Sequence, residues 1–270
     1  MAQWKITPLV YGTIDVTKGL VTTGLDADLP HKGVYLGFYL TNGTQKVLVD
    51  TGINEKYIVD GKAWGGLPAE GGEAHVLKSL DEAGVSAKAI DTVLYTHLHN
   101  DHAGNCHLFP KAVHIFQDAE WKELLDPLPS MKIRRDYDPE TIGVLSEMNC
   151  RRVSTDVEIF DGIRLIQTPG HTAGSQSLLV STVDGVYVLV GDTLPTLPNA
   201  FPKMTQWTQL DGSVLSITPA PREWGPAIPS GIIYDHYAWY RSVYQIHALL
   251  RGPEFLLPGH EVSLVGKTFG

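Results

Sequence analysis

The stretch that decides the fold is Thr96-His97-Leu98-His99-Asn100-Asp101-His102, which directly follows the apolar run at residues 92–95. It holds three imidazoles and a carboxylate, and imidazoles packed this closely repel one another when they are protonated. A divalent cation would instead turn these side chains into satisfied ligands. His97 and His99 are two residues apart, so their side chains project to the same side of an extended backbone. Asp101 and His102, which follow, suit a second ion about 3.5 to 4 Å from the first, and the stretch therefore predicts two metals.

The composition is that of a globular chain with one large core. Of 270 residues, 43% are apolar and 19% are charged. The net charge of −9 and the lack of a Lys/Arg cluster argue against a nucleic acid as the main partner and favour a small-molecule substrate. No apolar stretch approaches the roughly 20 residues that cross a bilayer, so we expect no membrane partner.

The first residues and the cysteines bear on cellular location. Residues 1–6 show no basic segment followed by an apolar core of the kind that directs export, which predicts a cytoplasmic protein. In a reducing compartment Cys106 and Cys150 are expected to be free thiols rather than a disulfide. Neither is needed as a metal ligand.

In the first part of the chain the pattern predicts strand, helix, strand and loop. Residues 33–40 and 45–50 are apolar and β-rich, and Asn42-Gly43 between them is a strong hairpin signal. A helix is expected from Glu73, where apolar residues recur at helical spacing, to a C-terminal Gly84. This helix leads to the strand before the metal stretch.

Further elements are predicted in the middle of the chain. One helix begins near Asp118, with Trp121, Leu124 and Leu125 on its buried side, and another begins near Asp138-Pro139. Strands are expected at residues 163–167, 177–180 and 186–190. Two apolar strands, at 46–49 and 186–190, lead to Asp50 and Asp192, which indicates two related β-rich halves.

The segment from about residue 195 to 240 departs from this pattern. Residues 195–229 hold seven of the 17 prolines together with Trp207 and Trp224. With Trp239 of a final helix at 235–250, such a segment could wall an apolar pocket over the metals, form an oligomer interface or fill core. We expect residues 1–270 to form a single domain in which this segment is an ordered excursion.

These motifs resemble those of the metallo-β-lactamase superfamily over nearly the whole chain. The HxHxDH signature of that family is matched in full by residues 97–102. The later family elements follow in order: His171 in Thr168-Pro169-Gly170-His171-Thr172, Asp192 after a strand, and His260 in Leu257-Pro258-Gly259-His260. The resemblance implies an α/β fold, a four-layer αββα sandwich.

The resemblance also implies the ligands of two divalent metal ions. The first ion would be held by His97, His99 and His171, the second by Asp101, His102 and His260, with Asp192 bridging both. Asp50 resembles the family's aspartate that orients ligands. The mixed imidazole and carboxylate donors predict zinc, although iron, manganese or cobalt fit the same set. The remaining histidines match no motif, and His31 and His75 in particular are expected at the surface.

The expected chemistry is hydrolysis. A hydroxide that bridges two such ions attacks an electrophilic carbonyl or phosphorus, while one metal polarises the oxygen that gains charge. Asp101 could also accept the proton of the nucleophile and pass it to the leaving group.

Within the superfamily the chain looks most like the N-acyl homoserine lactonase branch, which implies opening of a lactone or cleavage of a related ester. Lactonases of this branch carry a tyrosine three residues after the bridging aspartate, where this chain has Pro195. Tyr234, Tyr237 or Tyr240 could supply the missing phenol.

Other activities are open on the same metals. They include arylester or organophosphate hydrolysis, thioester hydrolysis and β-lactam hydrolysis. A diiron oxygen or nitric oxide reductase belongs to a different class, and it is disfavoured because that branch has an acidic residue where His99 stands. A binding module without catalysis is disfavoured by the intact ligand set.

Overall fold

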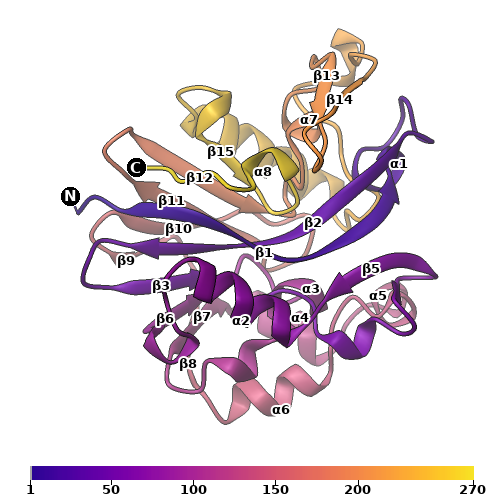
Figure 1. The fold of residues 1–270 in the computed structure, drawn as a ribbon. Coiled ribbons are helices and arrows are strands. Elements are labelled where there is room, and N and C mark those ends of the chain that lie inside the picture. Colours follow the sequence, from indigo (N-terminus) through magenta and orange to yellow (C-terminus); the bar gives the residue numbers. More distant parts are fainter. Residues whose placement is uncertain (1) are drawn as a thin grey trace.

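The computed structural model describes residues 2–270, and its strands form two β-sheets and a small hairpin. The larger sheet contains β1 (Lys5–Thr17), β2 (Pro30–Thr41), β3 (Lys46–Val49), β4 (Lys62–Ala63), β5 (Leu67–Gly71), β6 (Thr92–Leu94), β7 (Val113–Gln117) and β8 (Asn149–Val153). The smaller sheet contains β9 (Val157–Phe160), β10 (Ile163–Gln167), β11 (Gln176–Ser181), β12 (Val186–Gly191) and β15 (Leu256–Pro258). The hairpin is β13 (Gln206–Thr208) with β14 (Val214–Ser216). The strand orders are β4-β5-β1-β2-β3-β6-β7-β8 and β15-β12-β11-β10-β9 (Figure 1).

The helices lie on the outer faces of the two sheets (Figure 1) or in the loops between strands. Their bounds are α1 (Lys18–Val21), α2 (Glu73–Glu82), α3 (Asn100–Ala103), α4 (Asp118–Leu125), α5 (Pro129–Arg134), α6 (Glu140–Ser146), α7 (Leu197–Ala200) and α8 (His236–Leu249). Across residues 2–270, no helix has the length and apolar character needed to cross a membrane.

Three apolar clusters fill the spaces between four layers. Val188, Trp239 and Val243 belong to the cluster between the smaller sheet and α8. A second cluster joins the facing sheets through side chains such as Leu36, Val47, Leu165 and Leu178, and a third packs α2, α4 and α6 on the larger sheet through Leu80, Leu124 and Leu145. Burying each such side chain contributes about 1.5 to 3 kcal/mol. This arrangement confirms the predicted αββα sandwich.

The hairpin signal is confirmed. Strands β2 and β3 pair antiparallel from Phe38 opposite Val49 to Thr41 opposite Lys46. Gly43 in the turn between them has a φ of +88°, a left-handed conformation that glycine adopts without steric penalty. The predicted helix from Glu73 is also present, and Gly84 follows it with a φ of +72°.

The helix from Asp118 is confirmed, but the predicted burial of one of its residues, Leu125, is wrong. Leu124 is 2% exposed, whereas Leu125 is 53% exposed. The inward side of α4 is taken instead by Glu120, which is fully buried and one helical turn before Leu124. Helix α5 was not predicted at all.

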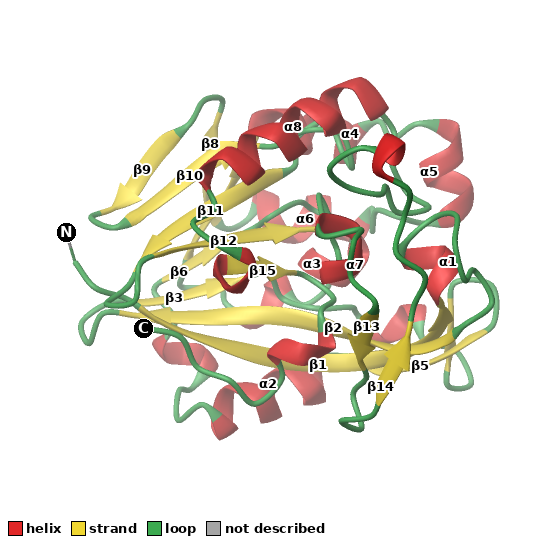
Figure 2. Cartoon of the chain, turned by 90° about the horizontal axis from the view of Figure 1, so that it is seen from above, coloured by secondary structure: helices red, strands yellow, loops and turns green. Residues whose placement is uncertain are grey.

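The Pro-rich segment is anchored to the rest of the protein by polar and aromatic contacts. Trp207 of β13 stacks on His31 of β2 with ring centroids 3.8 Å apart, and Figure 2 shows the hairpin beside β1 and β2. The amide of Asn199 donates to the carbonyl oxygens of Val21 and Ile228. His31 is therefore 3% exposed, and its predicted surface position is wrong.

Both sheets contain a pair of parallel strands whose carboxyl ends carry the polar motifs. In the larger sheet, β3 and β6 pair with Val49 opposite Leu94, and Asp50 and the metal stretch follow them. In the smaller sheet, β12 and β15 pair parallel, and they lead to Asp192 and His260. This correspondence agrees with the two related halves expected from the sequence, and it brings residues far apart in the chain to one end of the sandwich.

Candidate metal centre

The seven predicted ligands lie together in two clusters. The first contains His97, His99 and His171, and the second contains Asp101, His102, Asp192 and His260. Within each cluster the ligand atoms lie within 4.8 Å of one another. Five of the seven side chains are supplied by loops that follow strands of the two sheets, and Asp101 and His102 lie on the short helix α3.

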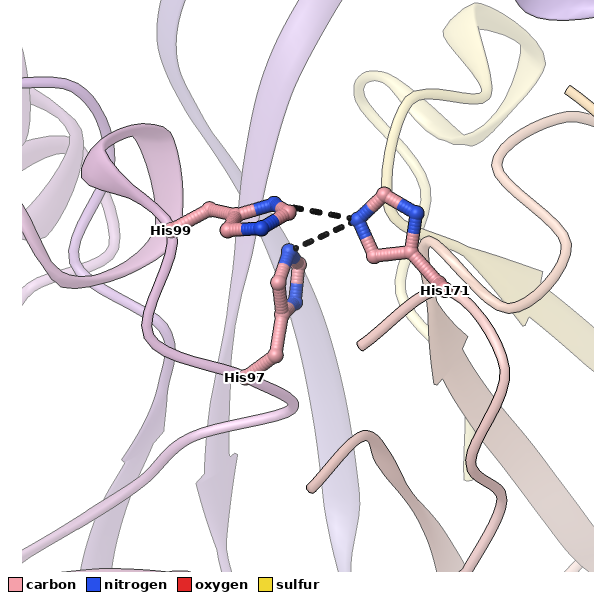
Figure 3. Close-up of side chains that lie close together, drawn as sticks. All are labelled: His97, His99 and His171. Atoms are coloured by element: carbon pink, nitrogen blue, oxygen red, sulfur yellow. Dashed lines mark hydrogen bonds between the residues drawn. The ribbon is translucent and has the colours of Figure 1, made fainter. Parts of the chain in front are cut away.

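In the first cluster three imidazole nitrogens converge on one point (Figure 3). Nε2 of His171 lies 3.2 Å from Nε2 of His97 and 3.1 Å from Nδ1 of His99. Nδ1 of His171 donates to the carbonyl oxygen of Ile232 at 2.7 Å, which leaves the lone pair on Nε2. In a tetrahedral zinc site with bonds of about 2.1 Å, neighbouring ligands are about 3.4 Å apart, so the spacing fits one metal ion.

In the second cluster two imidazoles face two carboxylates. Nδ1 of His102 donates to Asp50 at 2.9 Å and Nδ1 of His260 donates to the carbonyl oxygen of Val34 at 2.8 Å, so each presents Nε2 to the centre. A carboxylate oxygen of Asp101 lies 3.7 Å from Nε2 of both histidines. The cluster therefore combines nitrogen and oxygen donors.

Asp192 lies between the clusters and faces both. Its Oδ1 is 3.0 Å from Nε2 of His260 and 3.3 Å from Nε2 of His102, in the second cluster. Its Oδ2 is 3.6 Å from Nε2 of His171, in the first. One carboxylate thus directs one oxygen into each cluster.

The charge states of the two clusters differ. Burial lowers the pKa of His97, His99 and His171, which keeps these imidazoles neutral and their lone pairs available. Burial also acts to lower the pKa of His102 and His260, but the charges of Asp192 and Asp101, together with a hydrogen bond to Asp192, outweigh it and both pKa values are raised.

Two divalent cations fit this set of donors. Nε2 of His102 and Oδ1 of Asp192 are buried without a hydrogen-bond partner among the residues that the structure describes. Buried polar atoms in proteins are nearly always satisfied, and here the unsatisfied atoms point into the second cluster. Coordination would satisfy them, and it would also relieve the close approach of nitrogen lone pairs in the first cluster.

Asp50 supports the second cluster from behind, as the family resemblance implied. It accepts hydrogen bonds from the backbone N–H and the hydroxyl of Thr96, both at 2.8 Å, and from His102. The side chain is buried, and its backbone has a φ of +59°. A carboxylate behind a ligand imidazole fixes its tautomer and ring orientation.

Glu120 ties together the two loops of the first cluster, and the sequence analysis missed it. Its Oε1 accepts from the N–H of Leu98 at 2.9 Å and from the hydroxyl of Tyr137 at 2.7 Å. Its Oε2 accepts from the hydroxyl of Thr172 at 2.6 Å and the N–H of Gly174 at 3.1 Å. Leu98 separates two ligands, and Thr172 follows the third, so one carboxylate fixes both loops.

The environment of Glu120 is unusual for a carboxyl group. Burial and the charge of Glu123 raise its pKa to about 7, while its hydrogen bonds act in the opposite direction. A sequence signal was present, because Glu120 and Leu124 are four residues apart and share a helix face.

A cavity of about 590 Å³ opens onto the metal centre. Its wall includes the predicted ligands His99, Asp101, His171, Asp192 and His260. Arg134 and Asp136 add charged groups to the wall, and seven aliphatic side chains line it: Ile14, Val16, Leu20, Val21, Leu67, Ile133 and Ile232. The tryptophan in the wall is Trp64. Of the alternatives expected for Trp207, Trp224 and Trp239, core filling describes the buried Trp207 and Trp239, while Pro195 and residues 230–232 of the Pro-rich segment contribute to the wall.

The tyrosines considered as substitutes for the missing phenol lie elsewhere or are engaged. Tyr237 is 85% exposed and Tyr240 packs against Trp239. The hydroxyl of Tyr234 donates to Asp136. Tyr35 of β2, which the sequence analysis did not consider, lines the cavity next to His260.

The comparisons with known proteins agree with this fold and site. Residues 35–260 match the family described as the metallo-beta-lactamase superfamily, and since this match covers most of the chain, the protein belongs to that superfamily. An N-acyl homoserine lactonase of Bacillus cereus is 31% identical over 151 residues. That match covers 53% of this chain and 57% of the relative, so the chain spans little more than half the length of the curated relatives it matches.

Solved structures support the fold over a longer range. AiiA of Bacillus thuringiensis, crystallised as a mutant with N-decanoyl-L-homoserine at its active site, has a TM-score of 0.75 at 20% identity, with 97% of this chain and 95% of AiiA covered. AidC, described as a dizinc quorum-quenching lactonase, has a TM-score of 0.70 at 16% identity, with 96% and 88% covered.

Proposed function

We propose that this protein is a two-metal hydrolase that opens a lactone, or cleaves a related ester, with zinc as its metal. The observation that carries the proposal is the position of Asp192, whose two carboxylate oxygens face different ligand clusters. The first ion would bind His97, His99 and His171, and the second Asp101, His102 and His260. When bound, two such ions supply Lewis-acid polarisation of a carbonyl and activation of water near neutral pH.

The residues of the chain carry the rest of the reaction. Water adds to the lactone carbonyl carbon, the ring C–O bond breaks, and a hydroxy acid is released. Asp101 takes the proton from the attacking water and passes it to the released oxygen, since its carboxylate lies beside His102 and His260 in the cavity wall. Burial raises the pKa of Asp101, which favours its carrying a proton between these two positions.

The cavity supports a small apolar substrate. Seven aliphatic side chains line it, and its volume of about 590 Å³ is within the range of small-molecule sites. Because the relatives are lactonases, acyl homoserine lactones are the first class of small apolar substrate to test.

Zinc and a cytoplasmic location complete the proposal. Imidazole and carboxylate donors without thiolate suit zinc, and AidC is described as dizinc. Cys106 and Cys150 are free, as predicted, and free thiols accord with a reducing compartment.

The test is a hydrolysis screen of the zinc-loaded protein. The substrates are acyl homoserine lactones, simple lactones, aryl esters, thioesters, organophosphates and a chromogenic β-lactam. We expect the highest kcat/KM on a lactone, followed by the aryl esters. A higher value on an organophosphate or the β-lactam would contradict the lactone assignment, and rapid oxygen uptake by the reduced iron form would contradict hydrolysis altogether.

A further inference from the structure

Tyr35 carries a hydroxyl without a partner in the wall of the cavity. Its side chain is 1% exposed, and within residues 2–270 its hydroxyl makes no hydrogen bond. A buried hydroxyl in a native protein is normally paired, because leaving it unpaired costs free energy. In a cavity next to a metal centre, a substrate oxygen is the natural acceptor.

The backbone on both sides of Tyr35 holds a predicted metal ligand. The carbonyl oxygen of Val34 accepts from Nδ1 of His260 at 2.8 Å, and the N–H of Leu36 donates to the carbonyl oxygen of Gly259 at 3.2 Å. The ring of Tyr35 meets the His260 ring edge-on, with centroids 6.1 Å apart. The phenol is therefore fixed relative to the second cluster by the same strand that orients His260.

Pro195 flanks His260 from another side. Its carbonyl oxygen accepts the backbone N–H of His260 at 2.9 Å, and its side chain lines the cavity without any hydrogen-bond donor. Tyr35 and Pro195 thus both contact His260, and of these two side chains only that of Tyr35 can donate a hydrogen bond.

We propose that the hydroxyl of Tyr35 donates a hydrogen bond to the ring oxygen of a lactone as that oxygen leaves. This inference rests on the proposed lactone hydrolysis. Tyr35 contacts the ring of His260 and lines the same cavity as Asp101, which is the residue assigned to protonate the leaving oxygen. The phenol stabilises the negative charge that develops on this oxygen, and the site then favours oxygen esters over thioesters, since sulfur is a weak acceptor.

The test compares Tyr35→Phe with Tyr39→Phe in the zinc-loaded protein. Both residues lie on β2, and Tyr39 is outside the cavity wall. The substrates are an acyl homoserine lactone and the thiolactone with the same acyl chain. We expect Tyr35→Phe to lower kcat/KM on the lactone by about 10- to 100-fold, mainly through kcat, and on the thiolactone by no more than about threefold. Tyr39→Phe should behave as wild type, and metal content should stay at two ions per chain in both variants.

Three results would overturn the inference. These are wild-type kinetics of Tyr35→Phe on the lactone, an equal loss on lactone and thiolactone, or a loss of metal, which would assign Tyr35 a structural role. If the wild type opens no lactone, the proposed function fails instead, and the variants are then compared on a p-nitrophenyl ester and its thioester counterpart. On that pair a selective loss on the oxygen ester supports the role of Tyr35, and an equal loss contradicts it.

Discussion

The two ligand clusters lie side by side but hold their donors in different ways. The first consists of three neutral imidazoles, and its loops are joined from behind by the buried Glu120. The second mixes imidazoles with carboxylates, and Asp50 and the carbonyl oxygen of Val34 orient its histidines. A dication would be attracted by charge to the second cluster, whereas in the first its binding would depend on preorganised lone pairs. Asp192 is the one side chain that serves both.

Removal of the shared carboxylate is expected to have the largest effect. In Asp192→Ala both clusters lose a donor, so we expect metal content below one ion per chain and turnover lowered by at least about 1000-fold. Elemental analysis and kcat measurement check this, with the exposed Asp28→Ala as the matched control. Activity retained in a metal-depleted Asp192→Ala protein would refute the two-metal reaction.

Asp101→Asn separates catalysis from folding in the second cluster. The amide keeps one oxygen for a metal but cannot carry a proton, so we expect kcat to fall by roughly 100- to 1000-fold. The melting temperature of the zinc-loaded protein should change by only a few degrees. An unchanged rate would exclude both roles proposed for Asp101.

Glu120→Gln should weaken the first cluster alone. In one orientation the new amide nitrogen would face the hydroxyl of Thr172 and the N–H of Gly174. In the other it would face the N–H of Leu98 and the hydroxyl of Tyr137, so in either case one loop loses its hydrogen-bond acceptor. Support of this kind is typically worth about 10- to 100-fold in metal affinity. Chelator competition should show one weakened site and one unchanged site.

The control for this change is Glu123→Gln. Glu123 also accepts from Tyr137 and from the N–H of Ala173, but it contacts no residue next to His97 or His99. We expect its metal affinities to match the wild type within about threefold, because the loop of His171 keeps its two hydrogen bonds to Glu120 when the bond from Ala173 is weakened. Equal weakening of both sites in Glu120→Gln would contradict the assignment of this carboxylate to the first cluster.

Tyr137→Phe should give the smallest effect. The phenol donates to Glu120 at 2.7 Å, while the ring packs edge-on against His99 with centroids 4.7 Å apart. Phenylalanine keeps the ring contact and loses one hydrogen bond, which is worth about 1 kcal/mol. Thermal unfolding of the metal-free protein measures the loss, and a much larger destabilisation would mean that Tyr137 does more than hold Glu120.

The candidate ligands could be named from the sequence because one motif is local and the family resemblance implies the rest. Residues 97–102 place four donors within six residues, and a strand before Asp192 and a Pro-Gly pair before His260 mark two more. The fold followed from the same motifs, and the hairpin at Asn42-Gly43 was set by turn chemistry alone.

The supporting and lining residues could not be predicted in the same way. Glu120 is a polar residue on an amphipathic helix, and only the tertiary contacts with Leu98 and Thr172 give it a function. Tyr35 lies between the apolar Val34 and Leu36 in a buried strand, where a core position is the ordinary expectation. Only the tertiary contact between its ring and His260 places it at the site. Leu125 was misplaced because the inward side of α4 is occupied by a carboxyl group, which apolar periodicity does not register.

The most direct test of the central claim is the metal content of three proteins after saturation with zinc and removal of excess. These are the wild type, His171→Ala, which opens the first cluster, and His260→Ala, which opens the second. If each cluster binds one ion, we expect two zinc ions per chain in the wild type and one in each variant. A wild type that holds a single ion, or a variant that still holds two, would contradict the account.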